Sequence, residues 1–413
     1  MGVVVLLRGI SGFDVWSART WSSILSADTP TDVPRAHGSG PDPDRVLLFG
    51  SDMFLGRGML SHDLAFPGQF ARAVSQTTSR GIDVDLDARP KLLVADALAA
   101  VEGIHFDRYD AVLLHFGLAD AMAQTTALAW RTSLDALFDH LEFAMSVSGH
   151  IFVIESPDPT TDPLFRSGHA TKVAKSVRSY NTQTVAAAAG RTTTTVLPFP
   201  VTTGSPLPRV DTPSTFARFA QTFAQPVAAH LDLEFRAGSG RSPAISSESD
   251  RQRSLENLRI LDTVGEERFD RIVASARARF HTQYAAFNLI DGDRRWSKSQ
   301  IGSGPAESPR EHEFCNLTIH QHGALIVGDA QLDTRFAANP LVVGEPHIRF
   351  YAGYPIESPD GQRIGTLCVY DPEPRDASVM DAITLRDLAI AIEKELWVDN
   401  SDHRRHPLGF EVS

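Results

Sequence analysis

The chain has 413 residues, of which 42% are hydrophobic and 22% are charged. These fractions are typical of folded proteins and exclude a chain that is disordered throughout. Its 51 acidic and 39 basic residues give a net charge of −12, which argues against a general nucleic-acid binder because such proteins normally carry a basic balance. The length predicts about two or three domains.

Cysteine content, apolar runs and the first residues of the chain bear on cellular location. The two cysteines, Cys315 and Cys368, are too few for a disulfide framework and suit a reducing compartment. We find no apolar run of about 18 residues, so we expect no transmembrane helix. The first residues lack the basic region and cleavage site of a signal peptide. The sequence therefore predicts a cytoplasmic protein that does not contact a membrane.

Two stretches rich in Pro, Gly, Ser and Asp divide the chain, at 26–44 and 237–249. Such composition is typical of turns and linkers. We therefore predict an N-terminal segment and linker over 1–43, a first domain over 44–234, a flexible linker over 235–250, a second domain over 251–398 and a disordered tail over 399–413.

The first domain alternates strand and helix signals. We expect strands at 45–49, 82–86, 111–116, 151–154 and 195–197, and helices at 63–78, 92–102, 127–147, 170–189 and 214–232. Short strands separated by helices predict an α/β fold, a flavodoxin-like parallel sheet with helices on both faces. In such folds, ligands bind at the carboxyl ends of the strands.

Three segments of this domain carry a family resemblance: 46–58 (VLLFGSDMFLGRG), 112–121 (VLLHFGLADA) and 210–214 (VDTPS). In order and spacing they resemble the first, third and last blocks of the SGNH/GDSL hydrolases. The resemblance implies an ester-hydrolase scaffold. That chemistry needs a serine nucleophile, a histidine base and donors for the oxyanion.

The residues that this chemistry needs are replaced. The nucleophile position falls on Asp52, and Ser51 stands one residue early, where an extended chain points its side chain to the other face. The oxyanion asparagine position falls on Ala119, the histidine position on Thr212 and its acidic partner on Arg209. We therefore expect a domain without catalytic residues.

An alternative interpretation keeps the activity. It is an SGNH/GDSL-type esterase or lipase that is regulated by the second domain. Its catalytic residues would be Ser51, Asp52 and Asp120, with a base drawn from His62, His115 or His169. The ordinary reading is that His115 packs inside a strand and that Asp120 caps a helix.

The second domain has a different pattern. We expect helices at 254–261, 266–279, 313–320 and 378–397, and strands at 283–290, 294–301, 324–327, 349–355 and 363–370. Strands in succession, flanked by helices, favour an antiparallel sheet in an α+β fold. Ser378, with Asp381 three residues later, is the expected N-cap of the last helix.

Six segments in this region resemble the GAF domains of bacterial signalling proteins. They are 258–263 with 267–270, 291–299 (DGDRRWSKS), 313–315 (EFC), 329–342, 348–353 (IRFYAG) and 365–369 (GTLCV). The resemblance implies a central antiparallel sheet with a ligand pocket on one face. By motif position, the residues expected to line or brace that pocket are Trp296, Phe314, Cys315, Asp329, Phe336, Arg349 and Tyr351.

Each of these residues also has an ordinary structural interpretation. Arg349 could brace a loop carboxylate such as Asp329 or Asp333, and the aromatic side chains could fill the core. The cysteines could form a redox pair or anchor a tetrapyrrole, and some GAF relatives reduce free methionine sulfoxide. However, Glu311 and Glu313 oppose a thiolate at Cys315, and Cys368 stands in an apolar run.

We therefore expect no thiol chemistry, no cofactor and no metal, since two cysteines without matched histidines do not predict a zinc site. The sequence indicates a signalling or sensor protein that binds a small molecule, a partner signalling protein or both, and that is not an enzyme. We expect a homodimer formed through the flanking helices 254–262 and 378–397. The identity of the ligand does not follow from the sequence.

Overall fold

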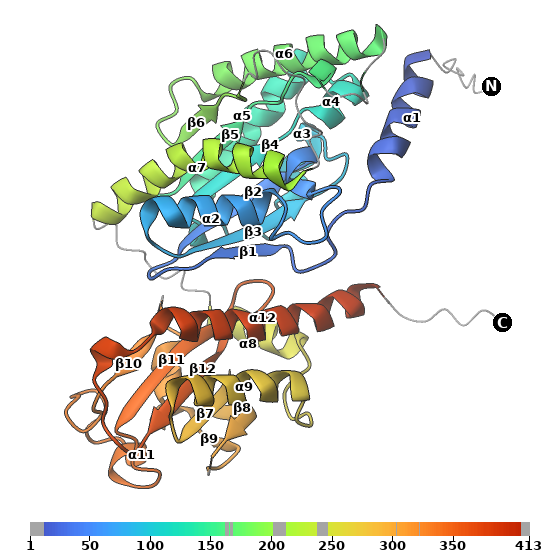
Figure 1. Cartoon of the computed structure of the whole chain (residues 1–413). Coiled ribbons are helices and arrows are strands. Elements are labelled where there is room, and N and C mark those ends of the chain that lie inside the picture. Colours follow the sequence, from blue (N-terminus) through green and yellow to red (C-terminus); the bar gives the residue numbers. More distant parts are fainter. Residues whose placement is uncertain are drawn as a thin grey trace, which may run out of the picture. The chain divides into compact units, whose positions relative to one another are not determined.

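The computed structural model describes residues 12–161, 165, 168–200, 212–237, 247–302, 304–321 and 323–405. The chain divides into two compact units, Met1–Gly240 and Arg241–Ser413. Each unit has its own six-stranded sheet (Figure 1). None of the helices described in the structure is long and apolar enough to cross a membrane.

The sheet of the first unit confirms the expected flavodoxin-like α/β fold. Its strand order is β1-β3-β2-β4-β5-β6, and all pairs are parallel except β1 with β3. The strands are β1 Arg35–Gly38, β2 Asp44–Gly50, β3 Ile82–Ala88, β4 Ala111–His115, β5 His150–Ile154 and β6 Thr194–Leu197. β4 is buried along its whole length, as expected for a strand covered on both faces.

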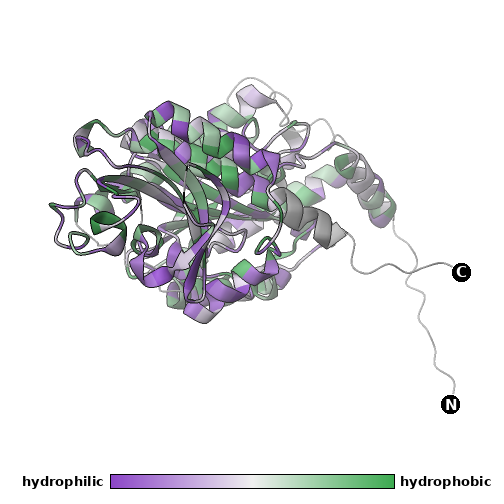
Figure 2. Cartoon of the chain, turned by 90° about the horizontal axis from the view of Figure 1, so that it is seen from below, coloured by the Kyte–Doolittle hydropathy of each residue, from purple (hydrophilic) through white to green (hydrophobic). Residues whose placement is uncertain are grey.

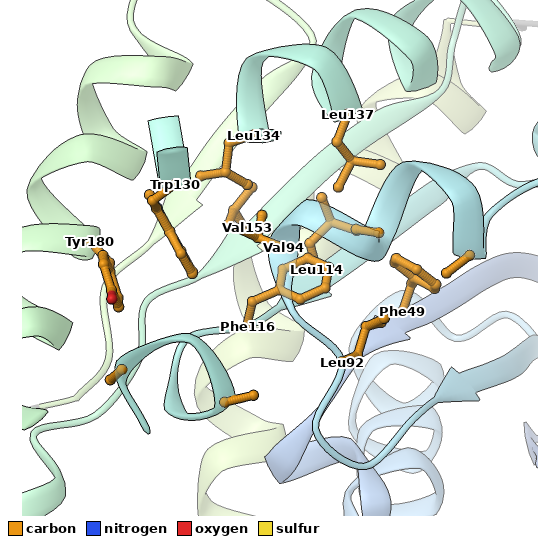
Figure 3. Close-up of a cluster of buried hydrophobic side chains, with 14 of the residues drawn as sticks. Phe49, Leu92, Val94, Leu114, Phe116, Trp130, Leu134, Leu137, Val153 and Tyr180 are labelled. Carbon is orange, nitrogen blue, oxygen red and sulfur yellow. The ribbon is translucent and has the colours of Figure 1, made fainter. Parts of the chain in front are cut away.

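Helices cover both faces of this sheet. On one face lie α2 Phe66–Thr78 and α7 Pro213–Arg236. On the other lie α1 Gly12–Leu25, α3 Val94–Ala100, α4 Leu118–Ala123, α5 Ala127–Ala144 and α6 Gly168–Ala188. Figure 3 shows the core of this second face, where Phe49, Leu114 and Val153 of the sheet meet Trp130 and Leu134 of α5.

The predicted N-terminal linker is wrong from residue 12 onward. α1 buries Phe13, Trp21 and Ile24 in the core of the first domain. β1 extends the sheet as an antiparallel edge strand, and Arg35 forms an ion pair with Asp85 of β3 at 2.5 Å. The turn-rich stretch 26–44 therefore contains the strand β1, because tertiary contacts outweigh its local composition.

The second unit has the expected antiparallel sheet, in the order β10-β11-β12-β7-β8-β9. Its strands are β7 Tyr284–Asp291, β8 Arg294–Ile301, β9 Glu307–Pro309, β10 Leu325–Val327, β11 Phe350–Glu357 and β12 Arg363–Asp371. The three-residue edge strand β9 is absent from the sequence-based expectation, because a run this short has no readable alternation.

The helices of this unit differ between the two faces of the sheet. One face packs on α8 Glu248–Asn257, α9 Glu267–Phe280 and α12 Ala382–Arg405. Among the described residues, the other face is covered by short elements and loops, including α10 Phe314–Thr318 and α11 Pro340–Val343. The helices carry hydrophobic and hydrophilic residues side by side, as amphipathic helices do (Figure 2).

Several predicted boundaries need correction. α8 is capped by Ser247, so the second domain starts before residue 251. α12 continues through Arg405, so residues 399–405 of the predicted tail are helical. Its first turn is capped by Asp381, which accepts a hydrogen bond from the Thr384 amide at 2.9 Å. Ser378 belongs instead to a separate turn of 3-10 helix.

Candidate functional site

The first candidate site lies where the strand order of the parallel sheet reverses, between the carboxyl ends of β2 and β4. Ligands of doubly wound sheets bind at this kind of position. Gly50 ends β2 opposite His115 of β4, and a side chain at Gly50 would collide with the His115 carbonyl. The next residue, Ser51, donates its amide to that carbonyl at 2.9 Å and is fully buried.

Asp120 performs a structural task beside this position. The fully buried carboxylate accepts hydrogen bonds from the Val94 amide at 3.2 Å and from the Thr125 hydroxyl at 3.0 Å. It thereby joins the start of α3 to the end of α4. This role agrees with the ordinary interpretation of Asp120 rather than with that of a catalytic acid. Asp52 begins a short 3-10 helix, and its side chain lies outside the described part of the structure.

The three candidate bases all have partners elsewhere. The His62 ring pairs with Asp32 at 2.7 Å, and the Asp32 carboxylate also accepts the His62 amide. The His115 ring is buried and reaches the Ile154 carbonyl at 3.3 Å. The His169 ring packs against Trp16, with ring centres 5.5 Å apart. These contacts place the three histidines in three separate environments.

The positions that correspond to the family's oxyanion asparagine and histidine also serve the fold. Ala119 is buried in α4 and offers no side-chain donor. Thr212 is the N-cap of α7, and its hydroxyl accepts the Thr215 amide at 3.2 Å. Arg209 lies outside the described residues. At the positions that the sequence resemblance matched to hydrolase residues, Ala119 and Thr212 therefore contribute to the fold.

The second candidate site lies on the face of the antiparallel sheet that α10 covers. Side chains alternate between faces along each strand, so this face can be assigned from the two separate cores. On the helix-covered face the strands present Phe287, Leu289, Leu367 and Val369. On the opposite face the same central strands present polar side chains: Asn288, Arg295, Ser297, Tyr351, Thr366 and Cys368.

Hydrogen bonds connect this polar row into a buried chain. The Arg295 guanidinium donates to the Ser297 hydroxyl at 2.5 Å. The Ser297 hydroxyl in turn donates to the side-chain oxygen of Asn288 at 2.7 Å. Arg295 also pairs with Glu313, at 3.2 Å from Nε to the carboxylate, and both side chains are about nine-tenths buried. A buried charge is tolerated when it is paired in this way.

Aromatic rings form the cover of this face. The Phe314 ring stacks on Phe336 with ring centres 4.1 Å apart, and on Tyr351 with ring centres 4.9 Å apart. The Tyr351 hydroxyl bonds to Thr318 at 2.8 Å, which links β11 to the end of α10. Burial raises the pKa of Tyr351 well above its ordinary value, so its hydroxyl stays protonated at neutral pH.

Both cysteines lie at the centre of this cluster and are almost fully buried. The Asn288 side-chain amide donates to the Cys315 sulfur at 3.3 Å and to the Cys368 sulfur at 3.4 Å. A hydrogen bond from the Cys368 thiol lowers the pKa of Cys315, against the raising effects of burial and of Glu313. The same pairing raises the pKa of Cys368. Glu313 therefore opposes a thiolate at Cys315, as expected, while the Cys368 thiol favours one.

The other predicted residues divide into two places. Asp329 and Arg349 form a two-pronged ion pair at 2.5 and 2.6 Å, which lowers the pKa of the Asp329 carboxyl. This is the bracing role that the sequence left open as an alternative. Trp296 lies on the opposite face, in the core against the helices. The structure thus brings together Phe314, Cys315, Phe336 and Tyr351, and separates Trp296 from them.

Sequence reasoning missed four polar members of the cluster, Asn288, Arg295, Ser297 and Thr366, and it considered Glu313 only as a charge beside Cys315. The signal was present as polar residues at alternate positions within buried strands. Reading it requires knowing which face each strand turns inward, and a bulge between Phe287 and Asn288 shifts that register. Within the part of the chain that the structure describes, no three His, Cys, Asp or Glu side chains gather closely enough to hold a metal ion.

Comparison with known proteins supports the assignment of the second domain. The model of the GAF domain family matches residues 265–396. Over 133 residues the chain is 41% identical to a cyclic di-GMP phosphodiesterase of Pseudomonas aeruginosa. This match spans 32% of the present chain and only 23% of that relative.

Solved structures resemble parts of the chain at low identity. A free methionine-R-sulfoxide reductase from Neisseria meningitidis is 20% identical, with a TM-score of 0.28, over 38% of this chain and 96% of that one. A GAF domain from an Acinetobacter phosphotransferase is 17% identical, with a TM-score of 0.28, over 40% and 100% of the two chains. A lipase/acylhydrolase from Enterococcus faecalis is 16% identical, with a TM-score of 0.33, over 47% and 96%.

The family match and the antiparallel sheet agree on the same part of the chain. GAF domains are found in sensor and signalling proteins, as the sequence resemblance implied. Residues 265–396 of this chain are a GAF domain.

Proposed function

We propose that the protein is a signalling protein whose GAF domain binds a small polar molecule on the face of the sheet beneath α10. The observation that carries this proposal is the buried polar row formed by Arg295, Ser297, Asn288 and Thr366 in the middle of that face. An ordinary core face is apolar, as the opposite face of the same sheet is. Ligand sites combine apolar walls with a few placed polar groups.

The composition of the row supports a ligand that both donates and accepts hydrogen bonds. The Thr366 hydroxyl is fully buried and makes no hydrogen bond of ordinary geometry with any described residue, although it lies close enough to Cys315 to lower the pKa of that thiol. Leaving such a group unsatisfied costs about 1–3 kcal/mol, which a bound ligand would recover. The stacked rings of Phe314, Phe336 and Tyr351 would supply the apolar wall.

A thermal-shift screen of the full chain against free amino acids and cyclic nucleotides tests the proposal. We expect at least one compound to raise the melting temperature of the wild type. The Ser297→Ala variant should lose that response, because its hydroxyl belongs to the polar row. The matched control is Ser299→Ala on the same strand, whose hydroxyl instead bonds to Asp270 of α9 at 2.6 Å. Equal responses in both variants, or no response in the wild type, would contradict the proposal.

We propose further that the first domain is an SGNH-like scaffold without hydrolase activity. Burial of Ser51, the structural role of Asp120 and the capping role of Thr212 support this reading over the esterase alternative. Short acyl esters of p-nitrophenol should be hydrolysed only at the background rate, and Ser51→Ala should not change it. Turnover that Ser51→Ala abolishes would restore the esterase interpretation.

Association with a partner signalling protein or with a second copy of the chain remains part of this proposal. On α12, Leu385, Ile392 and Leu396 are buried in the core of the GAF domain itself. A dimer would therefore have to use other faces of α8 and α12. Light scattering on the full chain measures the oligomeric state directly.

A further inference from the structure

The thiol pair of the GAF domain lies at the junction of two elements. Cys315 belongs to the five-residue helix α10, and Cys368 to the central strand β12. The two residues are far apart in the sequence, yet a single donor, the Asn288 amide, reaches both sulfur atoms at 3.3 and 3.4 Å. Both side chains are thiols in this structure.

The hydrogen-bonding groups around the pair differ between the two sulfur atoms. Cys315 accepts hydrogen bonds from Asn288 and from the Tyr351 hydroxyl, the latter at 3.7 Å. Three groups, the Cys368 thiol, Thr366 and Asn288, favour the Cys315 thiolate, and the same coupling favours the protonated Cys368 thiol. A thiolate is the nucleophilic form of cysteine, so the arrangement contains one attacking sulfur and one thiol held beside it.

We propose that Cys315 and Cys368 form a reversible redox site that closes to a disulfide in the presence of a peroxide. The Cys315 thiolate attacks one peroxide oxygen, forming an S–O bond while the O–O bond breaks, and the departing hydroxide takes a proton and leaves as water. Cys368 then attacks the sulfenic sulfur. An S–S bond forms, the S–O bond breaks, and the released hydroxide combines with the Cys368 proton as a second water.

Access to Cys315 depends on the elements that cover it. The residue is almost fully buried, but its cover is a single-turn helix and loops, whereas the opposite face lies beneath three longer helices. Short elements of this kind open locally at lower free energy than the whole domain unfolds. Hydrogen peroxide, a molecule little larger than water, needs only such an opening.

Closure of the disulfide would act on the proposed ligand site. Bonding Cys315 to β12 draws α10 toward the sheet, and Phe314 is the residue immediately before it. The stack of Phe314 on Phe336 and Tyr351 would have to shift, and the bonds from Asn288 and Tyr351 to the sulfurs would change. The redox state of the pair would thereby set the shape of the cluster. The formation of the disulfide itself does not rest on the proposed ligand.

To test the proposal, the reduced full chain is treated with hydrogen peroxide and then denatured in a thiol-blocking reagent. Mass spectrometry then identifies which cysteines were blocked. We expect the two free thiols to be lost together and a peptide linked through Cys315 and Cys368 to be found within one chain. Dithiothreitol should restore both thiols. In Cys368→Ser, a dimedone adduct should accumulate on Cys315, because the sulfenic acid has lost its resolving thiol.

The matched variant is Cys315→Ser, in which Cys368 should stay reduced and should not react with dimedone. Thr366→Val, which removes a group that favours the thiolate, should slow the loss of thiols in an otherwise folded domain. Circular dichroism before the peroxide step checks that each variant is folded. Thiols that persist in the folded wild type, disulfides only between chains, or oxidation of Cys368 in Cys315→Ser would overturn the proposal.

Discussion

His150 is a residue of the first domain whose surroundings strongly favour its neutral form. It begins β5, its ring lies 4.4 Å from that of His230 on α7, and its Nε2 contacts the Thr195 hydroxyl at 2.8 Å. Burial, followed by the nearby His230, lowers the pKa of His150 from its ordinary value of 6.5 to about 4, with Glu234 acting in the opposite direction. The folded state therefore holds this imidazole neutral in mildly acidic solution.

This shift predicts a loss of stability in acid. Between about pH 6.5 and pH 4 the unfolded chain binds a proton at His150 and the folded chain does not, so the free energy of unfolding falls as pH falls. Because the ring is only half-buried, solvent screening limits the effect to about 1–2 kcal/mol. Urea unfolding at pH 7 and pH 4.5 measures it. His150→Gln should lose less stability than the wild type over this range, and equal losses would contradict the assignment.

Single residues also show how the positions that the sequence resemblance matched to hydrolase motifs serve the fold of the first domain. Thr212 stands at the family's histidine position and caps α7, and Ala119 fills the core at the asparagine position. Both serve the scaffold at places where a hydrolase would need polar chemistry. The sequence showed these replacements, but the capping role of Thr212 and the bracing role of Asp120 became visible only with their partners in place.

Among the elements, α12 shows how an amphipathic helix divides its apolar residues between core and surface. The sequence predicted a helix over 378–397, and α12 is present there. Its apolar stripe consists of Ile383, Leu385, Leu388, Ile392 and Leu396. Leu385, Ala389, Ile392 and Leu396 are buried against the sheet and α9, and only Ile383 among the stripe residues is exposed.

We therefore expect Leu396→Asp to destabilise the GAF domain rather than to separate a dimer. The substitution places an unpaired carboxylate in the core, where the cost exceeds about 4 kcal/mol. Chemical unfolding followed by circular dichroism should show a large fall in stability or an unfolded domain. Ile383→Asp, on the exposed side of the same helix, is the control and should leave stability nearly unchanged. Similar stability of Leu396→Asp and wild type would be incompatible with this placement.

At the scale of the whole molecule, the two domains have separate cores. The first domain holds one apolar cluster on each side of its parallel sheet, and the GAF domain holds one on each side of its antiparallel sheet. The GAF domain begins with α8, in which the Arg251 guanidinium donates to the Ile290 carbonyl at 2.6 Å. Burial of Arg251 ties this helix to the sheet, so a cut at residue 250 would remove the cap and first turn of α8.

A fragment spanning residues 247–405 should therefore fold on its own. We expect it to unfold cooperatively, with the melting temperature that the GAF domain shows in the full chain, because its core has all its members within the fragment. A fragment starting at residue 258, which lacks α8, is the control and should melt at a lower temperature. Differential scanning calorimetry compares the three proteins. A 247–405 fragment without a cooperative transition would contradict the independence of the domain.

The sequence by itself determined the two-domain organisation, the fold class of each domain and the identity of the GAF domain, because these depend on periodicity and motifs along the chain. It also showed Asp52, Ala119 and Thr212 at the positions where the resemblance to hydrolases implies Ser, Asn and His. Only the tertiary structure decided that α1 and β1 complete the first domain, since their stability comes from contacts with distant residues. The tertiary structure also separated Trp296 from the aromatic cluster, because strand register decides which face of the sheet a side chain occupies. It brought Asn288, Cys315 and Cys368 together, because packing decides which residues far apart in the chain come into contact.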